Sequence, residues 1–396
     1  MSEASMYQGW MGRGYLPATD LTRVPGPPDR NMLDLARVTF VQGAMPPPVT
    51  REAVVAIGNF DGVHRGHADL IAHARREATS RGIECVVLTF DPHPAHVLRP
   101  HEPTPLVSTP IERAAWMHAL GVDHVLVWPF DADVQSQTPE QFVQAITRFV
   151  HPRAIIHGPG FAVGRGRAGT SAVLAEVGRT HGFEMIEVVP VTAPSGDTTH
   201  GSPLISSSAI RRLVETGSIA DASTYLGRLP TYLGTVRHGN KMGRTIGFPT
   251  ANVHPDGPRA TPLDGVYAAW VERNPLSSTA VFHAGAISIG DRPTFNGTIR
   301  LVEAFLPGFD GDLYDQELRL HFVARLRGQV RRQSGLFRRD PKQMEAGGHI
   351  GVHLRDQRVN ALEPHLSPKA CHEVQAEFLV IEVTIEPWEK CLNKTD

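Results

Sequence analysis

The sequence predicts an α/β domain with a doubly wound parallel sheet, followed by a small antiparallel β-barrel. Between residues 53 and 190, continuous apolar segments alternate with segments of helical periodicity, which is typical of strands buried on both faces and joined by helices. From about residue 229, short alternating segments are separated by glycine, proline, asparagine and aspartate, as in small barrels. A length of 396 residues suits two domains rather than one.

The elements of the first domain follow in order along the chain. We expect its strands at 53–58, 83–90, 122–128, 153–157 and 184–190, and its helices at 65–80, 109–120, 138–150 and 169–182. In such sheets, ligands bind beyond the carboxyl ends of the strands. The barrel strands are expected at 262–270, 280–289, 299–305 and 317–324.

These patterns divide the chain into four parts. Residues 1–50 are an irregular proline-rich extension, and residues 51–228 are the α/β domain. Residues 229–362 are the barrel domain, and residues 363–396 are an unassigned tail. A helix is expected within 341–361, although a glycine pair there disfavours it, and a strand is expected at 378–385.

The composition excludes several classes of protein. Hydrophobic residues make up 41% and charged residues 20%, as in soluble globular proteins. A net charge of -2 disfavours a nucleic-acid backbone as the main ligand. Three cysteines form neither a disulfide framework nor a zinc motif, and no signal peptide or membrane-spanning apolar run is present. We therefore expect a cytoplasmic protein without nucleic-acid or membrane partners, and self-association stays open.

A glycine-rich segment with two histidines joins the first strand to the first helix. The string GNFDGVHRGH contains Gly58, Gly62 and Gly66, which allow tight turns close to a ligand. A helix N-terminus offers N–H groups and a partial positive charge, which suit phosphate oxygens. His64 and His67 can both face one anion and stabilise the charge that develops on a triphosphate. The alternative, a zinc-binding pair, lacks further ligands in the sequence.

A second glycine-rich segment follows the predicted domain boundary. RHGNKMGRTIGFPTAN combines three glycines with two cations, namely Gly239, Gly243, Gly247, Lys241 and Arg244. Such a loop can surround ATP phosphates, although turns in a barrel also need glycine. Thr250 and Asn252 follow, and their oxygen atoms suit Mg²⁺ when ATP phosphates supply the other ligands. We therefore expect ATP and Mg²⁺ to bind here.

The motifs of the α/β domain resemble those of the nucleotidylyltransferase superfamily, within it the FAD synthetase branch. LTFDPHP, which ends at Pro94, is similar to the TFDPHP stretch of that branch, and ISSSAIR, which ends at Arg211, resembles its ISSTxxR motif. Alone, ISSSAIR would indicate a serine-capped helix start. The resemblance implies catalytic roles for His64 and His67. It implies ATP contacts from Gly58, Asn59, Phe60, Gly62, His64, His67, Ser206, Ser207, Ser208 and Arg211. It implies flavin contacts from Phe90, Asp91, His93 and Phe161.

One segment of the α/β domain departs from this family pattern. The family usually has GxDFxFG or GxNFxFG, and this chain has GPGFAVG from Gly158. Gly160 stands where an amide or carboxylate is expected, and Val163 replaces an aromatic ring that could stack on a flavin or adenine. This difference predicts that flavin placement is affected more than phosphate binding.

The second glycine-rich segment resembles the GxxxGxxxGxPTAN signature of riboflavin kinases. IGDRPTF and LVEAF, the latter followed by FDGDLY, resemble two further motifs of those kinases. The resemblance implies that Glu303 is the general base that takes the proton of the riboflavin 5′-hydroxyl. Without this context, Glu303 would be an exposed residue of an edge strand. The resemblance also implies flavin contacts from Gly265, Val266, Tyr267 and Arg292. Asp315 replaces a glycine of the family pattern.

The resemblance spans about residues 52–327 and implies a bifunctional enzyme. Its substrates would be riboflavin, FMN and ATP, with riboflavin phosphorylated to FMN and FMN adenylylated to FAD. Two alternatives stay open. One is a paralogue that phosphorylates riboflavin or an analogue while its α/β domain is degenerate or repurposed. The other is a non-catalytic flavin-nucleotide sensor, against which the presence of His64, His67, Thr250 and Glu303 argues.

Overall fold

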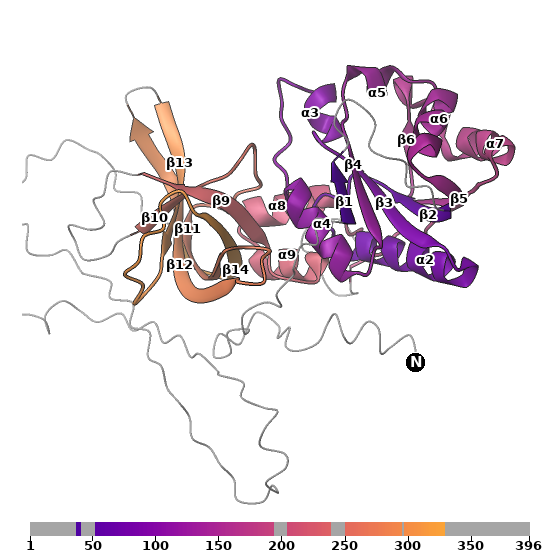
Figure 1. Cartoon of the computed structure of the whole chain (residues 1–396). Coiled ribbons are helices and arrows are strands. Elements are labelled where there is room, and N and C mark those ends of the chain that lie inside the picture. Colours follow the sequence, from indigo (N-terminus) through magenta and orange to yellow (C-terminus); the bar gives the residue numbers. More distant parts are fainter. Residues whose placement is uncertain (1–36, 41–51, 194–203, 239–249, 295–296, 329–396) are drawn as a thin grey trace, which may run out of the picture. The chain divides into compact units, whose positions relative to one another are not determined.

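The computed structural model describes residues 37–40, 52–193, 204–238, 250–294 and 297–328, apart from the side chains of 292–299 and 328. These residues form an α/β domain with a parallel sheet and a closed antiparallel β-barrel (Figure 1). The fold class predicted from the sequence is confirmed. The helix expected within 341–361 and the strand expected at 378–385 lie outside the described residues.

The α/β domain has a six-stranded parallel sheet in the order β1-β4-β3-β2-β5-β8. Its strands are β1 (Val38–Phe40), β2 (Glu52–Ile57), β3 (Glu84–Phe90), β4 (His124–Trp128), β5 (His151–His157) and β8 (Glu184–Glu187). Its helices are α2 (Arg65–Arg81), α3 (Pro94–Leu98), α4 (Pro110–Ala119), α5 (Ala132–Ser136), α6 (Pro139–Phe149), α7 (Ser171–His181), α8 (Ser207–Glu215) and α9 (Ile219–Leu226). A small hairpin consists of β6 (Ala162–Val163) and β7 (Gly169–Thr170), with the 3-10 turn η2 (Arg165–Arg167) between them.

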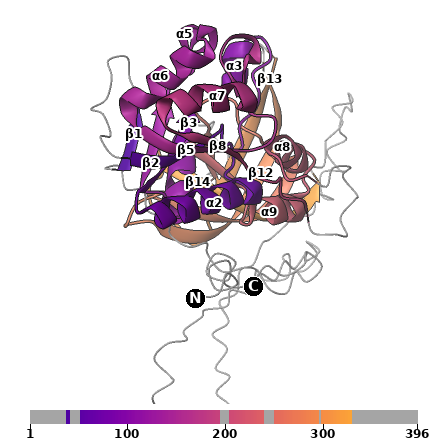
Figure 2. The same cartoon turned by 90° about the vertical axis from the view of Figure 1, so that its right-hand side faces the viewer.

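Strands β2, β3 and β4 are largely apolar after their first residue because helices cover both faces of the sheet. Val55 and Ile57 of β2 belong to the core shared with α6 and α7, whereas Val54 and Ala56 belong to the core shared with α2 and α4. Figures 1 and 2 show α2 on one side of the sheet and α6 and α7 on the other. This burial on both faces is the physical reason for the continuous apolar pattern.

Local sequence signals set the ends of several helices. The strings TPIE and TPEQ start α4 and α6, where Thr109 and Thr138 form capping boxes with the residue three positions later. Helices α2 and α7 end at Gly82 and Gly182, whose φ angles of 67° and 78° lie in the left-handed region that glycine adopts readily. The expected helices at these positions are therefore confirmed to within a few residues.

The N-terminal extension contributes one element that the sequence did not predict. Residues 38–40 form β1, which pairs in parallel with β4 at the edge of the sheet. The hydroxyl of Thr39 lies 2.7 Å from Nε2 of His124, the first residue of β4. The prediction that residues 1–50 are irregular is therefore wrong for residues 38–40, because three residues are too few to show an alternating pattern.

The barrel closes in the order β10-β13-β12-β11-β14-β9. Its strands are β9 (Thr231–Arg237), β10 (Thr250–His254), β11 (Gly265–Arg273), β12 (Val281–Thr294), β13 (Gly297–Phe305) and β14 (Glu317–Gly328). The four expected strands are present: β11 lies three residues later than expected, and β12, β13 and β14 extend beyond the expected ranges by two to five residues. Strands β9 and β10 were not predicted from the sequence; the segment of β10, TANVH, overlaps the end of the glycine-rich motif.

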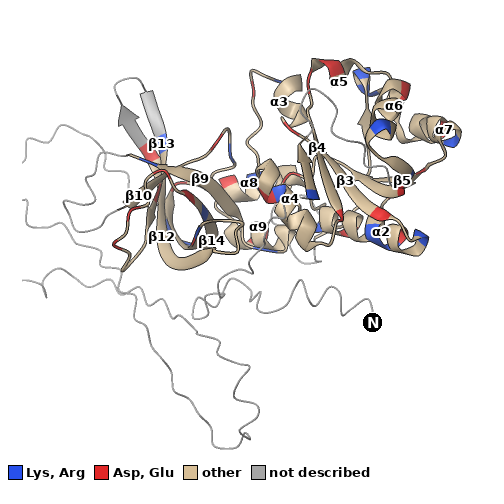
Figure 3. Ribbon diagram, viewed as in Figure 1, with Lys and Arg blue, Asp and Glu red and all other residues tan. Residues whose placement is uncertain are grey.

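Charged residues are distributed over the helices rather than the central strands. Helices α2 and α6 carry both acidic and basic residues, while β2 and β3 are uncharged after their first residue (Figure 3). In the described part of the chain, no helix combines the length and the apolar character that crossing a membrane requires.

Candidate functional site

The first glycine-rich loop lies at the carboxyl end of β2, between this strand and α2. His64 is the N-cap of α2, and its Nδ1 accepts a hydrogen bond from the backbone N–H of His67 at 3.3 Å. The two imidazole rings stack, with centroids 3.6 Å apart and an interplanar angle of 15°. The structure therefore brings the two histidines together in the first helical turn, as the sequence predicts.

Both histidines are electrically neutral at physiological pH. Burial lowers the pKa of His64 to about 3, although the carboxylate of Asp61 acts in the opposite direction. Burial also lowers the pKa of His67 well below its usual value, and the nearby His64, Arg113 and Arg228 add to this effect. Two stacked neutral rings can offer N–H groups to a phosphate, so any positive charge must come from arginine side chains and from the helix N-terminus.

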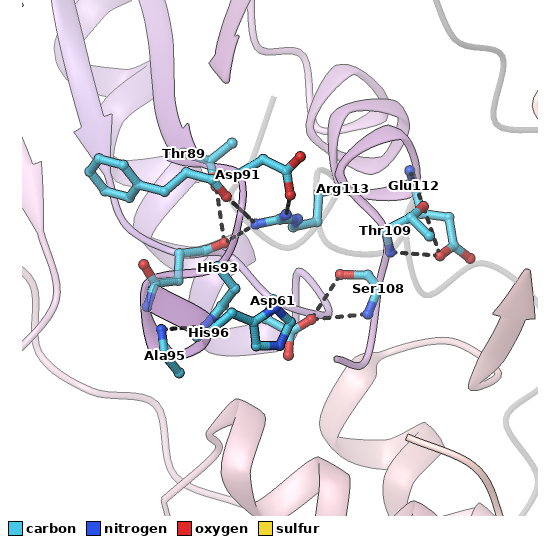
Figure 4. A network of polar contacts seen from close by, with 12 residues as sticks. Asp61, Thr89, Asp91, His93, Ala95, His96, Ser108, Thr109, Glu112 and Arg113 are labelled. Carbon is cyan, nitrogen blue, oxygen red and sulfur yellow. Dashed lines mark hydrogen bonds and ion pairs between the residues drawn. The ribbon is translucent and has the colours of Figure 1, made fainter. Parts of the chain in front are cut away.

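Buried polar contacts hold this loop in an uncommon conformation. Phe60 and Val63 have φ angles of 50° and 37°, which non-glycine residues rarely adopt. The carboxylate of the buried Asp61 accepts hydrogen bonds from the backbone N–H groups of Val107 (3.0 Å) and Ser108 (2.9 Å), and Figure 4 shows the contact with Ser108. Asp61 was not among the predicted site residues, because its partners lie more than 40 positions away in the sequence.

The predicted phosphate-binding serines lie at the start of α8, beside the same loop. Ser206 caps the helix by accepting from the N–H of Ala209, and the Ser207 hydroxyl donates to the Asp61 carbonyl at 2.8 Å. The exposed Ser208 hydroxyl accepts from Nη1 of Arg211 at 3.3 Å. ISSSAIR is thus both a helix cap and a neighbour of the histidine loop, and the two interpretations are compatible.

Arg211 supplies positive charge at this place. Its Nε lies 3.5 Å from a carboxylate oxygen of the buried Asp61. Because one of its nitrogens also donates to Ser208, the guanidinium contacts both the loop that precedes α2 and the first turn of α8. A triphosphate at this helix N-terminus would meet Arg211, Ser208 and the two histidines.

The predicted flavin residues after β3 differ in their exposure. Phe90 is buried and packs edge-on against Phe130, and the buried His93 caps α3 by accepting from the N–H of Ala95 at 3.1 Å. Burial lowers the pKa of His93 to about 4. The side chain of Asp91 is 44% exposed. Of these three side chains, only Asp91 is open to a ligand, and the other two support the loop.

Three other residues of this domain that were predicted to contact ATP or flavin differ in exposure and in the residues they pack against. Phe60 is fully buried, and its ring packs against His67 with centroids 5.1 Å apart. Asn59 is exposed, and its backbone carbonyl accepts from Thr89. Phe161 stacks on His157 with centroids 5.0 Å apart.

The segment that departs from the family pattern has room for a side chain at one glycine. At Gly160, where φ is 67°, an added Cβ would meet no atom within 4 Å. At Gly164 an added Cβ would lie 2.7 Å from the carbonyl oxygen of Gln137, so this position requires glycine. The missing amide or carboxylate at Gly160 is therefore a difference in chemistry and is not imposed by crowding.

In the barrel, the residues predicted to hold Mg²⁺ and to act as base lie together. Asn252 of β10 is directly opposite Glu303 of β13, and directly opposite residues share one face of a sheet. Thr250, two positions before Asn252, lies on that face as well. Its hydroxyl donates to Oε1 of Glu303 at 3.5 Å. A hydroxyl, an amide and a carboxylate therefore meet at one place.

These oxygen atoms fit a magnesium ion that also binds phosphate. Mg²⁺ prefers hard oxygen ligands and usually takes only one or two from protein, with phosphates and water supplying the rest. Among the described residues, no group of three or more histidines, cysteines and acidic side chains forms a metal cluster. A site built from Thr250 and Asn252 would therefore depend on bound ATP.

The row of paired residues continues from Glu303 across the barrel surface. Ser288 of β12 is opposite Glu303, and Val266 of β11 is opposite Ser288. Val266, a predicted flavin residue, therefore shares the face of the candidate base. Ser288 was not predicted to lie in the site, because only the strand register reveals its place.

Tyr267 lies on the other face, although it was predicted to contact the flavin. Its side chain is fully buried in the barrel core and packs against Phe322, with ring centroids 5.4 Å apart. Its hydroxyl donates to the carbonyl of Leu263. As strand residues alternate between faces, Tyr267 cannot share the surface of Val266. The neighbouring Gly265 is also buried.

The remaining predicted kinase residues are not described. Gly239, Lys241, Gly243, Arg244 and Gly247 lie outside the described residues, and so does the side chain of Arg292, whose backbone belongs to β12.

Asp315, which replaces a family glycine, keeps a glycine-like backbone. Its φ angle is 58°, and its carboxylate pairs with Nη1 of Arg237 at 2.9 Å. Aspartate is among the residues that tolerate this conformation best. The aspartate is therefore compatible with the backbone conformation of this turn.

Comparison with known proteins gives matches to both domains. A family model described as FAD synthetase matches residues 47–200, and one described as riboflavin kinase matches residues 226–335. A bifunctional riboflavin kinase/FMN adenylyltransferase from Listeria monocytogenes is 34% identical, with 70% of this chain and 85% of that protein covered. The protein of the same name from Haemophilus influenzae is 30% identical, with 72% and 88% covered.

Solved structures also include chains that are similar to this one. The crystal structure of a macrolide-efflux protein from Streptococcus pneumoniae is 27% identical, with a TM-score of 0.62. The match covers 75% of this chain and 93% of that chain.

Proposed function

The chain belongs to the bifunctional riboflavin kinase/FMN adenylyltransferase family, and from this premise we propose that it converts riboflavin to FMN and FMN to FAD. Riboflavin, FMN and ATP are the proposed substrates. We assign the phosphorylation of riboflavin to the barrel and the adenylylation of FMN to the α/β domain. The observation that carries the proposal is the meeting of Thr250, Asn252 and Glu303 on one face of the barrel.

The barrel residues support phosphoryl transfer to an alcohol. The 5′-oxygen of riboflavin attacks the γ-phosphorus of ATP, its proton passes to the carboxylate of Glu303, and ADP leaves. Glu303 is half-buried and oriented by the Thr250 hydroxyl, which favours one position for the base. Thr250 and Asn252 would hold Mg²⁺, which neutralises charge on the phosphates when bound.

The α/β domain supports adenylyl transfer. An oxygen of the FMN phosphate attacks the α-phosphorus of ATP, a new P–O bond forms, and the bond to pyrophosphate breaks as pyrophosphate leaves. His64 and His67 would donate hydrogen bonds to the phosphate oxygens, and Arg211 would supply charge beside them. Neither reaction requires a covalent enzyme intermediate, because positioning and electrostatic stabilisation suffice.

We expect the purified protein, incubated with riboflavin, ATP and Mg²⁺, to form FMN first and then FAD. Chromatographic separation of the flavins measures both steps. FMN without FAD would instead support a kinase-only paralogue, which the absence of a side chain at Gly160 favours. Unchanged riboflavin would contradict both enzymatic proposals and favour a flavin-nucleotide sensor.

Replacing Gly160 with asparagine is expected to increase the efficiency of FAD formation from FMN. The position has room, and asparagine tolerates the φ angle of 67° better than most residues. One added hydrogen bond contributes about 0.5–1.5 kcal/mol, so kcat/KM for FMN should rise roughly 2- to 10-fold. The matched control is Gly160→Ala, which adds the Cβ without the amide. Equal rates in the Asn and Ala variants would contradict the expected role of the amide.

A further inference from the structure

A fully buried arginine lies beneath the candidate adenylyl-transfer site. Arg113 belongs to the first turn of α4, and its side chain is 0% exposed. Its Nη1 donates to the carbonyl of Asn59 at 2.7 Å, to the hydroxyl of Thr89 at 3.2 Å and to the carbonyl of Phe90 at 3.3 Å. Figure 4 shows the guanidinium beside Thr89 and Asp91.

These acceptors belong to two different loops. Asn59 follows β2 and starts the loop that carries His64 and His67, whereas Phe90 ends β3 and starts the loop that carries Asp91 and His93. Strands β2 and β3 are parallel neighbours, so their loops leave the same edge of the sheet. A single nitrogen of Arg113 therefore joins the loop proposed to bind ATP to the loop proposed to bind the flavin.

A gain in folding stability is a poor explanation for this arginine. Burial lowers the pKa of Arg113, which reflects the cost of removing a guanidinium from water. Its Nε and Nη2 are buried and have no hydrogen-bond partner among the described residues. Nη2 forms only a long ion pair, at 4.0 Å, with the half-exposed carboxylate of Asp91, which is beyond hydrogen-bond distance. Buried donors without acceptors destabilise a fold, so Nε and Nη2 offset part of what the three hydrogen bonds of Nη1 contribute to stability.

We propose that Arg113 is a positioning residue for adenylyl transfer, which sets the separation of the histidine loop and the Asp91 loop. The inference rests on the proposed conversion of FMN to FAD. In that step, the FMN phosphate oxygen must lie in line with the α-phosphorus and the leaving pyrophosphate. A displacement of one loop by about 1 Å can reduce the rate about 100-fold. No local pattern in the sequence indicates this role, because Arg113 lies 54 positions from Asn59.

The test is a set of substitutions in the full-length protein. Arg113→Met removes the charge and all donors while retaining most of the volume, and Arg113→Lys keeps a charged donor that can reach the same carbonyls. The matched control is Arg75→Met in α2, because Arg75 is a half-buried arginine that donates to the carbonyl of Leu120 at the C-terminal end of α4, and neither residue belongs to the two loops. For each variant, kcat and KM are measured for FAD formation from FMN and for FMN formation from riboflavin, together with the melting temperature.

Arg113→Met is expected to lower kcat for FAD formation about 10- to 100-fold, with little change in the KM for ATP. FMN formation should be unchanged, Arg113→Lys should recover most of the lost rate, and Arg75→Met should behave as the wild type. A Met variant with wild-type kcat would overturn the inference. So would a loss of both activities in the Met and Lys variants in step with a lower melting temperature, because Arg113 would then act through stability alone. A wild-type protein that forms no FAD would instead remove the proposed adenylyl transfer itself.

Discussion

Replacing Glu303 with alanine is expected to lower the rate of FMN formation from riboflavin about 10²- to 10⁴-fold. The carboxylate lies opposite Asn252 and accepts from the Thr250 hydroxyl, so it is positioned beside the residues proposed to bind Mg²⁺ and phosphate. Without a base, the riboflavin hydroxyl keeps its proton as it attacks. Conversion of supplied FMN to FAD should be unaffected, because that reaction is assigned to the α/β domain. Chromatography of the flavins measures both rates in one preparation.

Two further variants show whether the slow FMN formation of Glu303→Ala comes from the loss of proton transfer or from the loss of a glutamate side chain in general. Glu303→Gln retains the size and a hydrogen-bond acceptor but cannot take up a proton at neutral pH, so it should be nearly as slow as the alanine variant. Glu317→Ala removes an exposed glutamate from the first position of β14 and serves as the control. Wild-type FMN formation by the Gln variant would show that Glu303 is not the base.

Prediction of the fold from sequence succeeded where burial leaves a local pattern. The apolar run of β2 and the capping boxes of α4 and α6 depend on neighbours within a few positions, so they can be recognised without the structure. The short edge strand β1 depends on pairing with β4, which is distant in the sequence. Its residues carry no comparable local signal.

The residues of the candidate sites show the same contrast between local motifs, which can be predicted, and contacts between distant parts of the chain, which cannot. His64, His67 and Glu303 were predicted because they stand in contiguous motifs, and the structure places each beside a predicted neighbour. The contacts that hold the histidine loop come from Asp61 and Arg113, whose partners lie 46 and 54 positions away. Strand alternation placed Tyr267 in the core, and a family motif alone does not distinguish a ligand contact from a supporting residue.

The barrel contains a buried ionic group that is independent of these motifs. Glu272 of β11 accepts from Nε of Arg319 at 2.6 Å and lies 2.9 Å from Nε2 of His321, both on β14. Burial alone would raise the pKa of Glu272, but the hydrogen bond from His321 and the charge of Arg319 outweigh it, so the pKa is lowered. Burial lowers the pKa of His321, which is therefore neutral. The stabilising charge of Glu272 is thus present at neutral pH and is lost as pH falls through its lowered pKa.

Replacing Glu272 with alanine is expected to reduce the stability of the barrel by about 3–5 kcal/mol, because Arg319 would remain as a buried charge without its anion. Urea unfolding followed by circular dichroism measures the change, and FMN formation reports whether the barrel is still folded. The double variant Glu272→Leu with Arg319→Met removes both charges and should be more stable than Glu272→Ala, since apolar residues of similar volume can replace a buried ion pair. If the double variant is no more stable than Glu272→Ala, the unpaired charge of Arg319 is not the cause of the loss, because the two variants share only the removal of the partner of Nε2 of His321.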